Sequence, residues 1–325
     1  MLSLKVKEHF QLKGSFSNPP DYFVIPPYQE ILQELKAAIL ECQLVVLAGV
    51  IGSGKTTLIR QLRDELERDN KVLVSKPAGV EAEKANIGAL VTALYYDLSP
   101  QKEIRVPSQS EKREQGLKKL IKDKKKPVVL FVDEAHDLHH KTLKGLKRLM
   151  EMIHDSKGKL SIVLIGHPKL RNDLNLPTME EIGLRTFAIA MDGFQNYRED
   201  YIHWLVKQCC EEGNYLEDVI EPEAASLLAQ KLTTPSQIRK RLAEAMEEAY
   251  QIGIRPITTD IVASVLSPST DEFASIMSRN GYGVKDLADR FNASVKEIKS
   301  LMQGKLEAAR CNELQEQMRE AGLPV

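Results

Sequence analysis

Cysteine is scarce in this sequence. The 325 residues contain four cysteines, and none of them shows the C-x-x-C spacing of a zinc ribbon or a redox pair. Two of the four, Cys209 and Cys210, are adjacent and cannot readily bridge each other. The pattern argues against a disulfide framework, so we expect a reducing, cytoplasmic setting.

Neither a charge excess nor a long apolar run is present. Lys and Arg number 45 against 46 Asp and Glu, for a net charge of −1, so any binding to nucleic acid must use a local patch. No apolar run approaches the roughly 18 residues that span a bilayer, and no signal-peptide pattern opens the chain. We expect no membrane partner. A hydrophobic content of 42% over this length predicts a substantial core in two or three domains.

One stretch matches a phosphate-binding loop in full. The apolar run 44–48 precedes Gly49-Val-Ile-Gly-Ser-Gly-Lys-Thr56, which fits G-x-x-x-x-G-K-[ST], and a helical pattern follows. Lys55 is expected to reach the β- and γ-phosphates, and the Thr56 hydroxyl to bind Mg²⁺. The sequence therefore predicts ATP and Mg²⁺ as cofactors. The expected nucleotide-binding residues are Gly49, Gly52, Ser53, Gly54, Lys55, Thr56 and Thr57.

A second acidic motif follows a buried strand. Residues 128–132 are all apolar, and Asp133 and Glu134 come directly after them. Ligands of open parallel sheets lie beyond the carboxyl ends of the strands, so both carboxylates are expected beside the phosphate loop. We expect Asp133 to hold Mg²⁺ and Glu134 to polarise the attacking water. Alone, such a pair could also cap a helix; together with the loop, it indicates hydrolysis.

Histidines cluster just after these acids. His136 and His140 stand at i, i+4, a spacing found in zinc sites, but no third ligand is evident and phosphate chemistry already explains the motif. Another apolar strand, 160–166, ends at His167. AAA+ enzymes place the sensor-1 residue, which contacts the γ-phosphate, at this position, usually as Asn or Thr. An ordinary loop histidine is the alternative.

Two arginines are candidates for contacts with phosphate. Arg185 precedes the apolar run 186–190, the place for an arginine finger that acts on a neighbouring subunit, or simply for a surface arginine at a strand entry. Arginine fingers contribute about 10³ to 10⁵ in rate in GTPases. Arg239 lies in the helix start Thr234-Pro-Ser-Gln-Ile-Arg and is the candidate sensor 2, a role that Arg241 could also fill.

Basic residues concentrate in two helical stretches, 111–126 and 141–148. Apolar residues at helical spacing form the other face of each stretch, so both are amphipathic. Such a face can simply be solvated, or it can grip the DNA backbone. The candidate DNA-binding residues are Lys119, Lys122, Lys141 and Lys144.

The hydrophobic pattern predicts four regions. Residues 1–27, rich in proline and aromatics, are expected to form an extended arm, and residues 28–195 an α/β nucleotide-binding domain with a parallel sheet. Strand patterns then stop, so residues 196–266 are expected to form a helical lid. Residues 267–325 suggest a small all-α module, either a helix-turn-helix DNA reader or a helical hairpin for protein contact.

Taken together, these motifs resemble the AAA+ ATPases that regulate transposition, of the TnsC, TniB and MuB type, and the related ExeA-type ATPases. The resemblance covers approximately residues 28–266, and the tail after Gly281 also looks like that of ATPases encoded beside transposases. It implies an ATP-dependent ring or filament on double-stranded DNA, largely independent of base sequence. It also implies recruitment of a transposase and a target-selection protein, with release on ATP hydrolysis. The alternative is a signalling or secretion-type AAA+ ATPase that acts on a protein without DNA.

Overall fold

A parallel sheet forms the centre of the computed structural model, which describes residues 2–14, 16, 19, 21–76, 86–99, 106–211, 213, 215–266 and 272–325. The sheet has five strands in the order β2-β3-β4-β1-β5. All neighbouring strands run parallel, and β1 pairs in register with both β4 and β5. The strands are β1 (Leu44–Ala48), β2 (Leu73–Ser75), β3 (Val128–Val132), β4 (Leu160–Gly166) and β5 (Thr186–Ala190).

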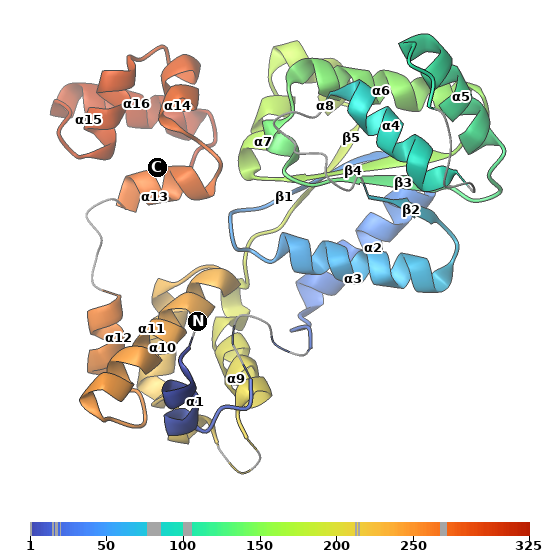
Figure 1. The fold of residues 1–325 in the computed structure, drawn as a ribbon. Helices are drawn as coiled ribbons and strands as arrows, with labels where there is room; N and C mark the ends of the chain where they lie inside the picture. Colours follow the sequence, from blue (N-terminus) through green and yellow to red (C-terminus); the bar gives the residue numbers. More distant parts are fainter. Residues whose placement is uncertain are drawn as a thin grey trace.

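Helices cover both faces of the sheet, as Figure 1 shows. Alternate side chains of each strand point to opposite faces, so Val45 and Leu47 join one core while Leu44 and Val46 join the other. Burial on both faces explains why β1, β3 and β4 are continuous apolar runs. One face carries α2 (Pro26–Leu40) and α3 (Lys55–Asp69); the other carries α4 (Ile87–Leu98), α5 (Ser110–Lys122), α6 (His140–Asp155), α7 (Pro168–Leu174) and α8 (Glu180–Gly183).

A helical lid follows β5 and shares a continuous hydrophobic core with the α2 and α3 face. Thr234 caps the longest lid helix through a capping box with Gln237. No helix within the described ranges combines the length and the apolar content needed to cross a membrane. The lid helices are α9 (Arg198–Cys209), α10 (Pro222–Lys231), α11 (Pro235–Ile252) and α12 (Thr259–Val265).

The prediction of an extended arm over residues 1–27 is wrong at its beginning. Residues Leu4–Phe10 form helix α1, which Ser3 caps by accepting a hydrogen bond from the Val6 amide at 3.3 Å. The helix buries Val6 and Phe10 and packs against α11 of the lid. The prolines that favour extended chain all lie between residues 19 and 27, so they do not prevent a helix before residue 11.

The C-terminal helices build a small core of their own. Asn292 adopts a left-handed φ of 46° in the turn between α14 and α15. Residues 267–271, where the predicted module begins, lie outside the described residues. The helices are α13 (Glu272–Arg279), α14 (Val284–Arg290), α15 (Val295–Met302) and α16 (Ala308–Glu320).

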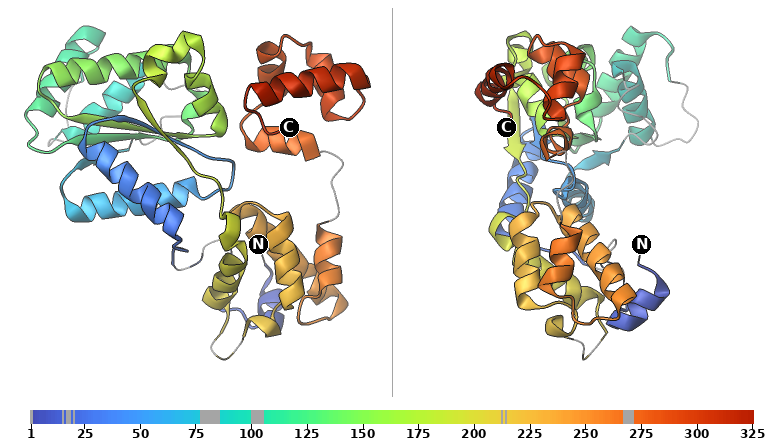
Figure 2. Two further views of the ribbon diagram at one scale, coloured as in Figure 1. Left: turned by 180° about the vertical axis from the view of Figure 1, so that it is seen from behind. Right: turned by 90° about the vertical axis from the view of Figure 1, so that its left-hand side faces the viewer.

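This C-terminal module packs on the α/β domain rather than on the lid helices (Figure 2). All of its side-chain bonds to that domain in the described structure reach α7. Arg290 pairs with Asp173 at 3.2 Å, and the Asn172 amide donates to Tyr282 Oη at 2.8 Å. A further ion pair joins Lys169 to the module. The predicted α/β fold with a helical lid and an all-α C-terminal module is confirmed.

Candidate nucleotide-hydrolysis site

The phosphate loop joins β1 to α3 at the carboxyl edge of the sheet. Gly52 and Gly54 have φ values of 81° and 102°, a left-handed conformation that side-chain-bearing residues rarely adopt. A Cβ at Gly52 would also lie 2.6 Å from Ser236 Cβ of the lid. The loop's glycines therefore permit both its turns and the close approach of the lid, and the N-terminus of α3 directs its amides toward the loop.

Lys55 is folded into this loop. Its ammonium group donates to the carbonyl oxygens of Gly49 at 2.6 Å and Val50 at 3.1 Å. Burial lowers the pKa of Lys55, while the nearby Glu134 and Asp133 carboxylates oppose the shift. A cation held among carbonyl oxygens and two carboxylates is well placed to exchange those partners for phosphate oxygens.

Three distant parts of the chain hold the main chain of the loop: the start of α2, the lid and the C-terminal module. None of these contacts can be deduced from the loop motif itself. Together they tie the loop's conformation to the positions of all three parts. Tyr28 Oη donates to Ser53 O (2.9 Å), the Ser236 amide to Gly52 O (3.3 Å), and the Ile51 amide to Arg279 O (3.0 Å).

Asp133 and Glu134 follow β3 at the same edge of the sheet, as predicted. The Asp133 carboxylate accepts a hydrogen bond from the Glu134 amide at 3.0 Å. Glu134 has a left-handed φ of 49°, although it is not glycine. Such a conformation costs about 1–3 kcal/mol and is concentrated at functional sites. The strain directs a carboxylate that is 59% exposed toward the end of β4.

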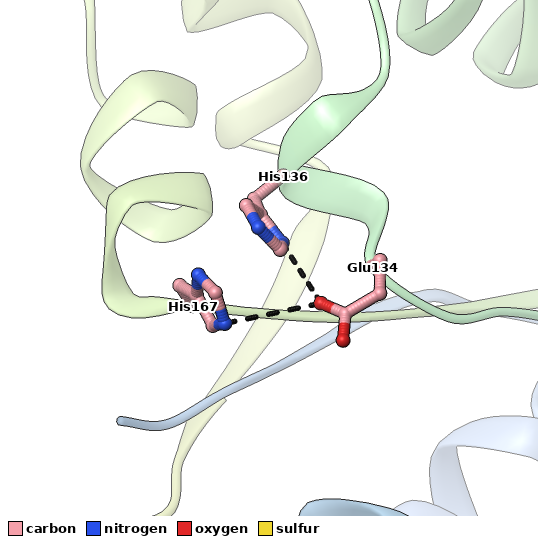
Figure 3. A group of neighbouring side chains, drawn as sticks. All are labelled: Glu134, His136 and His167. Carbon is pink, nitrogen blue, oxygen red and sulfur yellow. Dashed lines mark ion pairs between the residues drawn. The ribbon is translucent and has the colours of Figure 1, made fainter. Parts of the chain in front are cut away.

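His167 lies at the end of β4 and faces Glu134. Its Nε2 is 3.8 Å from Glu134 Oε2 (Figure 3). Burial lowers the pKa of His167 to about 4, and nearby cationic groups, Lys55 among them, add to the effect. The imidazole is therefore neutral near pH 7 and can donate or accept one hydrogen bond at each nitrogen.

His136 joins this pair, which the sequence did not predict. Its ring lies against the His167 ring with centroids 3.7 Å apart, and its Nδ1 is 3.3 Å from Glu134 Oε2. His139 and His140 are exposed and stay outside the group, and His139 instead caps α6. The adjacency of β3 and β4 is the signal that could have brought His136 and His167 together.

A cavity of about 640 Å³ opens beside the loop. Its volume lies within the range of small-ligand pockets. Aromatic side chains of residues 22–28, of the connection between β5 and α9, and of helix α9 form one wall of the cavity. Phe23 packs edge-on against Phe194 with centroids 5.3 Å apart. The sequence showed that residues 1–27 are rich in aromatics, which include Tyr22 and Phe23, but it indicated no site for them and gave no signal for Phe194. The aromatic lining residues are Tyr22, Phe23, Tyr28, Phe194, Tyr201 and Trp204.

The two sensor-2 candidates occupy different places. Arg239 lines this cavity together with Thr56 and Thr57 of the loop. Arg241 instead forms an ion pair with Glu244 on its own helix, at 2.8 Å, and is not a lining residue. The geometry therefore favours Arg239 for contact with a nucleotide bound in the cavity.

Arg185 lies at the opposite edge of the sheet. It precedes β5, which runs parallel to β1, so it stands at the amino ends of the strands while the loop stands at the carboxyl ends. The side chain is 63% exposed and pairs with Glu151 of α6. The structure thus does not bring Arg185 to the phosphate loop of its own chain.

The four predicted DNA-binding lysines all lie on the exposed surfaces of two packed helices. Lys119 and Lys122 project from α5, and Lys141 and Lys144 from α6. In the described part of the chain, none of the four forms an ion pair. Their charges are therefore available to an anionic partner.

Comparison with known proteins places these features in context. Residues 39–174 match the model of a family described as AAA domain. General secretion pathway protein A of Aeromonas hydrophila is 30% identical over 153 residues, which cover 44% of this chain and 26% of that protein. The chain thus spans only about a quarter of the length of this curated relative.

Solved structures resemble nearly the whole chain. Cdc6p from Pyrobaculum aerophilum superposes with a TM-score of 0.55 and 17% identity, covering 97% of this chain and 90% of that one. A Drosophila ORC structure bound to DNA gives a TM-score of 0.51 and 18% identity, covering 97% and 83%. At these identities the likeness shows the fold alone. The chain therefore has the P-loop AAA+ fold, and the stretch that matches the AAA domain model contains the phosphate loop and Glu134.

Proposed function

We propose that this protein is an ATPase that assembles head to tail on double-stranded DNA and regulates DNA transposition. The observation that carries the proposal is the division of the predicted residues between the two edges of the sheet. Lys55, Glu134 and His167 meet at one edge, and Arg185, paired with Glu151, lies at the other. A complete site then needs two subunits.

Within one subunit, each residue has a task that its position supports. Lys55 binds the β- and γ-phosphates, and Glu134 polarises the attacking water. The neutral imidazole of His167 orients that water or the γ-phosphate by a hydrogen bond. The hydroxyl of Thr56 and the carboxylate of Asp133 are hard oxygen donors that suit Mg²⁺, which when bound neutralises charge on the phosphates.

The aromatic cavity supplies the base-binding part of this site. Aromatic faces such as Phe23 and Trp204 stack on an adenine ring, and Arg239 reaches the phosphates from the lid. Because the lid and the N-terminal segment both line the cavity, nucleotide binding fixes their positions relative to the loop. The bound nucleotide thereby shapes the surface that a neighbouring subunit meets.

Assembly follows from the position of Arg185. A contact that joins one edge of the sheet to the opposite edge of the next subunit is heterologous, so its repetition gives a ring or a filament. In that contact, Arg185 leaves Glu151 and pairs with the neighbour's γ-phosphate. Hydrolysis removes that phosphate and loosens the contact, which releases the assembly.

DNA is the partner that the exposed lysines favour. Contacts from Lys119, Lys122, Lys141 and Lys144 to phosphates bind without regard to base sequence and weaken steeply with salt. The likeness in fold to ORC, solved bound to DNA, is consistent with this proposal. Transposition, with a transposase and a target-selection protein as partners, rests on the resemblance to the TnsC, TniB and MuB type.

The test is ATP-dependent assembly on random duplex DNA, imaged by negative stain and measured by filter binding from low to high salt. We expect rings or filaments with ATP and Mg²⁺, and none for Lys55→Ala, which cannot hold the phosphates. Glu134→Gln should assemble and fail to disassemble, because it binds ATP without hydrolysing it. Assembly of Lys55→Ala as efficient as wild type would contradict the proposal.

A secretion-type ATPase acting on a protein is the second candidate, favoured by the 30% identity to General secretion pathway protein A. It needs no DNA contact. Reversing the charge at Lys119 and Lys141 separates the two functions, because this change abolishes DNA binding in the first and leaves the ATPase cycle intact in the second. Retention of DNA-stimulated hydrolysis by the double variant would count against the DNA interface proposed here.

A further inference from the structure

Two imidazoles and one carboxylate converge at the end of β3 and β4 (Figure 3). Glu134 Oε2 lies 3.3 Å from His136 Nδ1 and 3.8 Å from His167 Nε2, and one ligand atom from each residue lies within 4.8 Å of the others. Bonds of 2.0–2.1 Å to a tetrahedral ion place neighbouring ligand atoms about 3.3–3.4 Å apart. The distance from Glu134 to His136 already fits this geometry, and a small rotation of the exposed Glu134 side chain would shorten its distance to His167.

The nitrogens in this group are short of partners. His136 Nδ1 is buried and forms no hydrogen bond in the described structure, because its approach to Glu134 is off hydrogen-bond geometry. Buried polar atoms are nearly always paired, so an orphan facing a carboxylate indicates a missing partner. A cation between the two imidazoles and the carboxylate would satisfy all three ligand atoms at once.

The surroundings of His136 are those of a metal ligand. The carboxylate of Asp137 lies 3.6 Å from its Nε2, on the side away from Glu134, which is the carboxylate–histidine arrangement that orients metal ligands. Gly166 makes room for this turn: a Cβ there would lie 3.2 Å from the His136 amide nitrogen. The 3₁₀ turn η2 (Ala135–Asp137) therefore holds His136 in place against the end of β4.

We propose that Glu134, His136 and His167 form a Zn²⁺ site that, when filled, blocks ATP hydrolysis. Two imidazoles and one carboxylate with an open fourth position are a ligand set for Zn²⁺, whereas Mg²⁺ prefers the oxygen donors of Thr56 and Asp133. A bound Zn²⁺ would coordinate the carboxylate oxygen with which Glu134 polarises water, and it would also coordinate the imidazole nitrogen of His167. This inhibitory consequence rests on the proposed ATPase function; the metal site itself does not.

Binding is tested without nucleotide, on the 325-residue chain stripped of metal by EDTA. Calorimetry with Zn²⁺, and the visible absorption of Co²⁺ as a probe of coordination geometry, should both show one site in wild type. His136→Gln and His167→Gln should lose it. Asp137→Asn keeps all three ligands and should weaken binding about 10- to 100-fold. His140→Gln, an exposed neighbour outside the group, is the matched control and should bind as wild type.

Circular dichroism shows whether each variant is folded, and Asp137→Asn changes an exposed residue, so the site can be tested even if a histidine variant misfolds. Absence of Zn²⁺ binding in wild type, or equal binding by folded His136→Gln, overturns the site. ATPase assays then compare each protein with and without Zn²⁺ at fixed Mg²⁺. We expect at least tenfold inhibition of wild type and His140→Gln, and loss of that sensitivity in His136→Gln.

The two assays separate the two proposals. Zinc binding that depends on His136 and His167, in a wild type that hydrolyses no ATP under any condition, supports the site and refutes the ATPase function. Hydrolysis by wild type that Zn²⁺ leaves unchanged while the site is demonstrably filled refutes the inhibitory role.

Discussion

The position of Arg185 allows a test in which two inactive variants restore each other. In the parallel sheet, β5 and β1 pair in register from Leu44 to Ala48, so Arg185 and the start of the loop are separated by the length of a strand. Arg185 stands opposite Gln43 and the loop begins at Gly49, so at about 3.3 Å per residue the separation is roughly 20 Å, farther than one arginine side chain extends. Arg185 therefore cannot reach the nucleotide of its own subunit, and its proposed role as an arginine finger requires a neighbouring subunit.

The expected loss of activity is that of an enzyme without its arginine finger. Arg185→Ala should lower kcat by about 10³ to 10⁵, the range for arginine fingers, and Glu134→Gln should also be inactive. A complete interface needs Glu134 from an Arg185→Ala subunit and Arg185 from a Glu134→Gln neighbour. In an equal mixture, each position holds the required subunit half of the time, so about one interface in four is complete. The mixture should therefore recover about a quarter of wild-type activity, although neither variant is active alone.

The assay is phosphate release at saturating ATP over a range of protein concentrations and mixing ratios. Arg68→Ala removes another exposed arginine, at the end of α3, and should leave the rate unchanged. If the mixture shows only the sum of the two separate rates while both variants still assemble, the composite site is refuted. Wild-type hydrolysis by Arg185→Ala alone would refute it as well.

Three other predictions follow from the described contacts. Phe23→Ala should raise the Kd for ATP about tenfold, measured by calorimetry, because it removes an aromatic wall of the cavity. Replacing Lys119 and Lys141 by Ala should reduce the slope of log Kd for DNA against log salt by about two. Gly281→Ala places a Cβ 2.7 Å from the Cβ of His167 and should increase hydrogen exchange in the C-terminal module; Gly304→Ala, also at positive φ but with nothing within 4 Å, is its control.

The fold and the loop could be predicted because their signals are local. A buried parallel strand is a continuous apolar run, and a phosphate loop needs glycines and a lysine at fixed spacing between a strand and a helix. The positions of Asp133 and Glu134 required one more rule, that the carboxyl ends of parallel strands share an edge. Each of these inferences depends on backbone geometry rather than on long-range packing.

The histidine group was beyond such reasoning. The sequence offers only the i, i+4 spacing of His136 and His140, which we did not adopt as a metal site and which places two residues on one face only in a continuous helix. In the structure, residues 135–137 form a 3₁₀ turn and α6 begins only at His140, so that spacing is lost. The true neighbour, His167, follows a different strand, and only the pairing of β3 with β4 brings it near.

The docking of the C-terminal module also depends on contacts that no periodicity reveals. The Arg279 carbonyl accepts the Ile51 amide of the phosphate loop, and Gly281 packs against His167. A protein or DNA partner that displaced the module would therefore free the Ile51 amide of the loop and expose His167. If displacing the module changes the affinity for nucleotide by some factor, then nucleotide binding changes the affinity for that partner by the same factor, because linkage is reciprocal. The ratio of the nucleotide Kd measured with residues 272–325 docked to the Kd measured with them displaced therefore gives the coupling free energy between nucleotide binding and docking of the module.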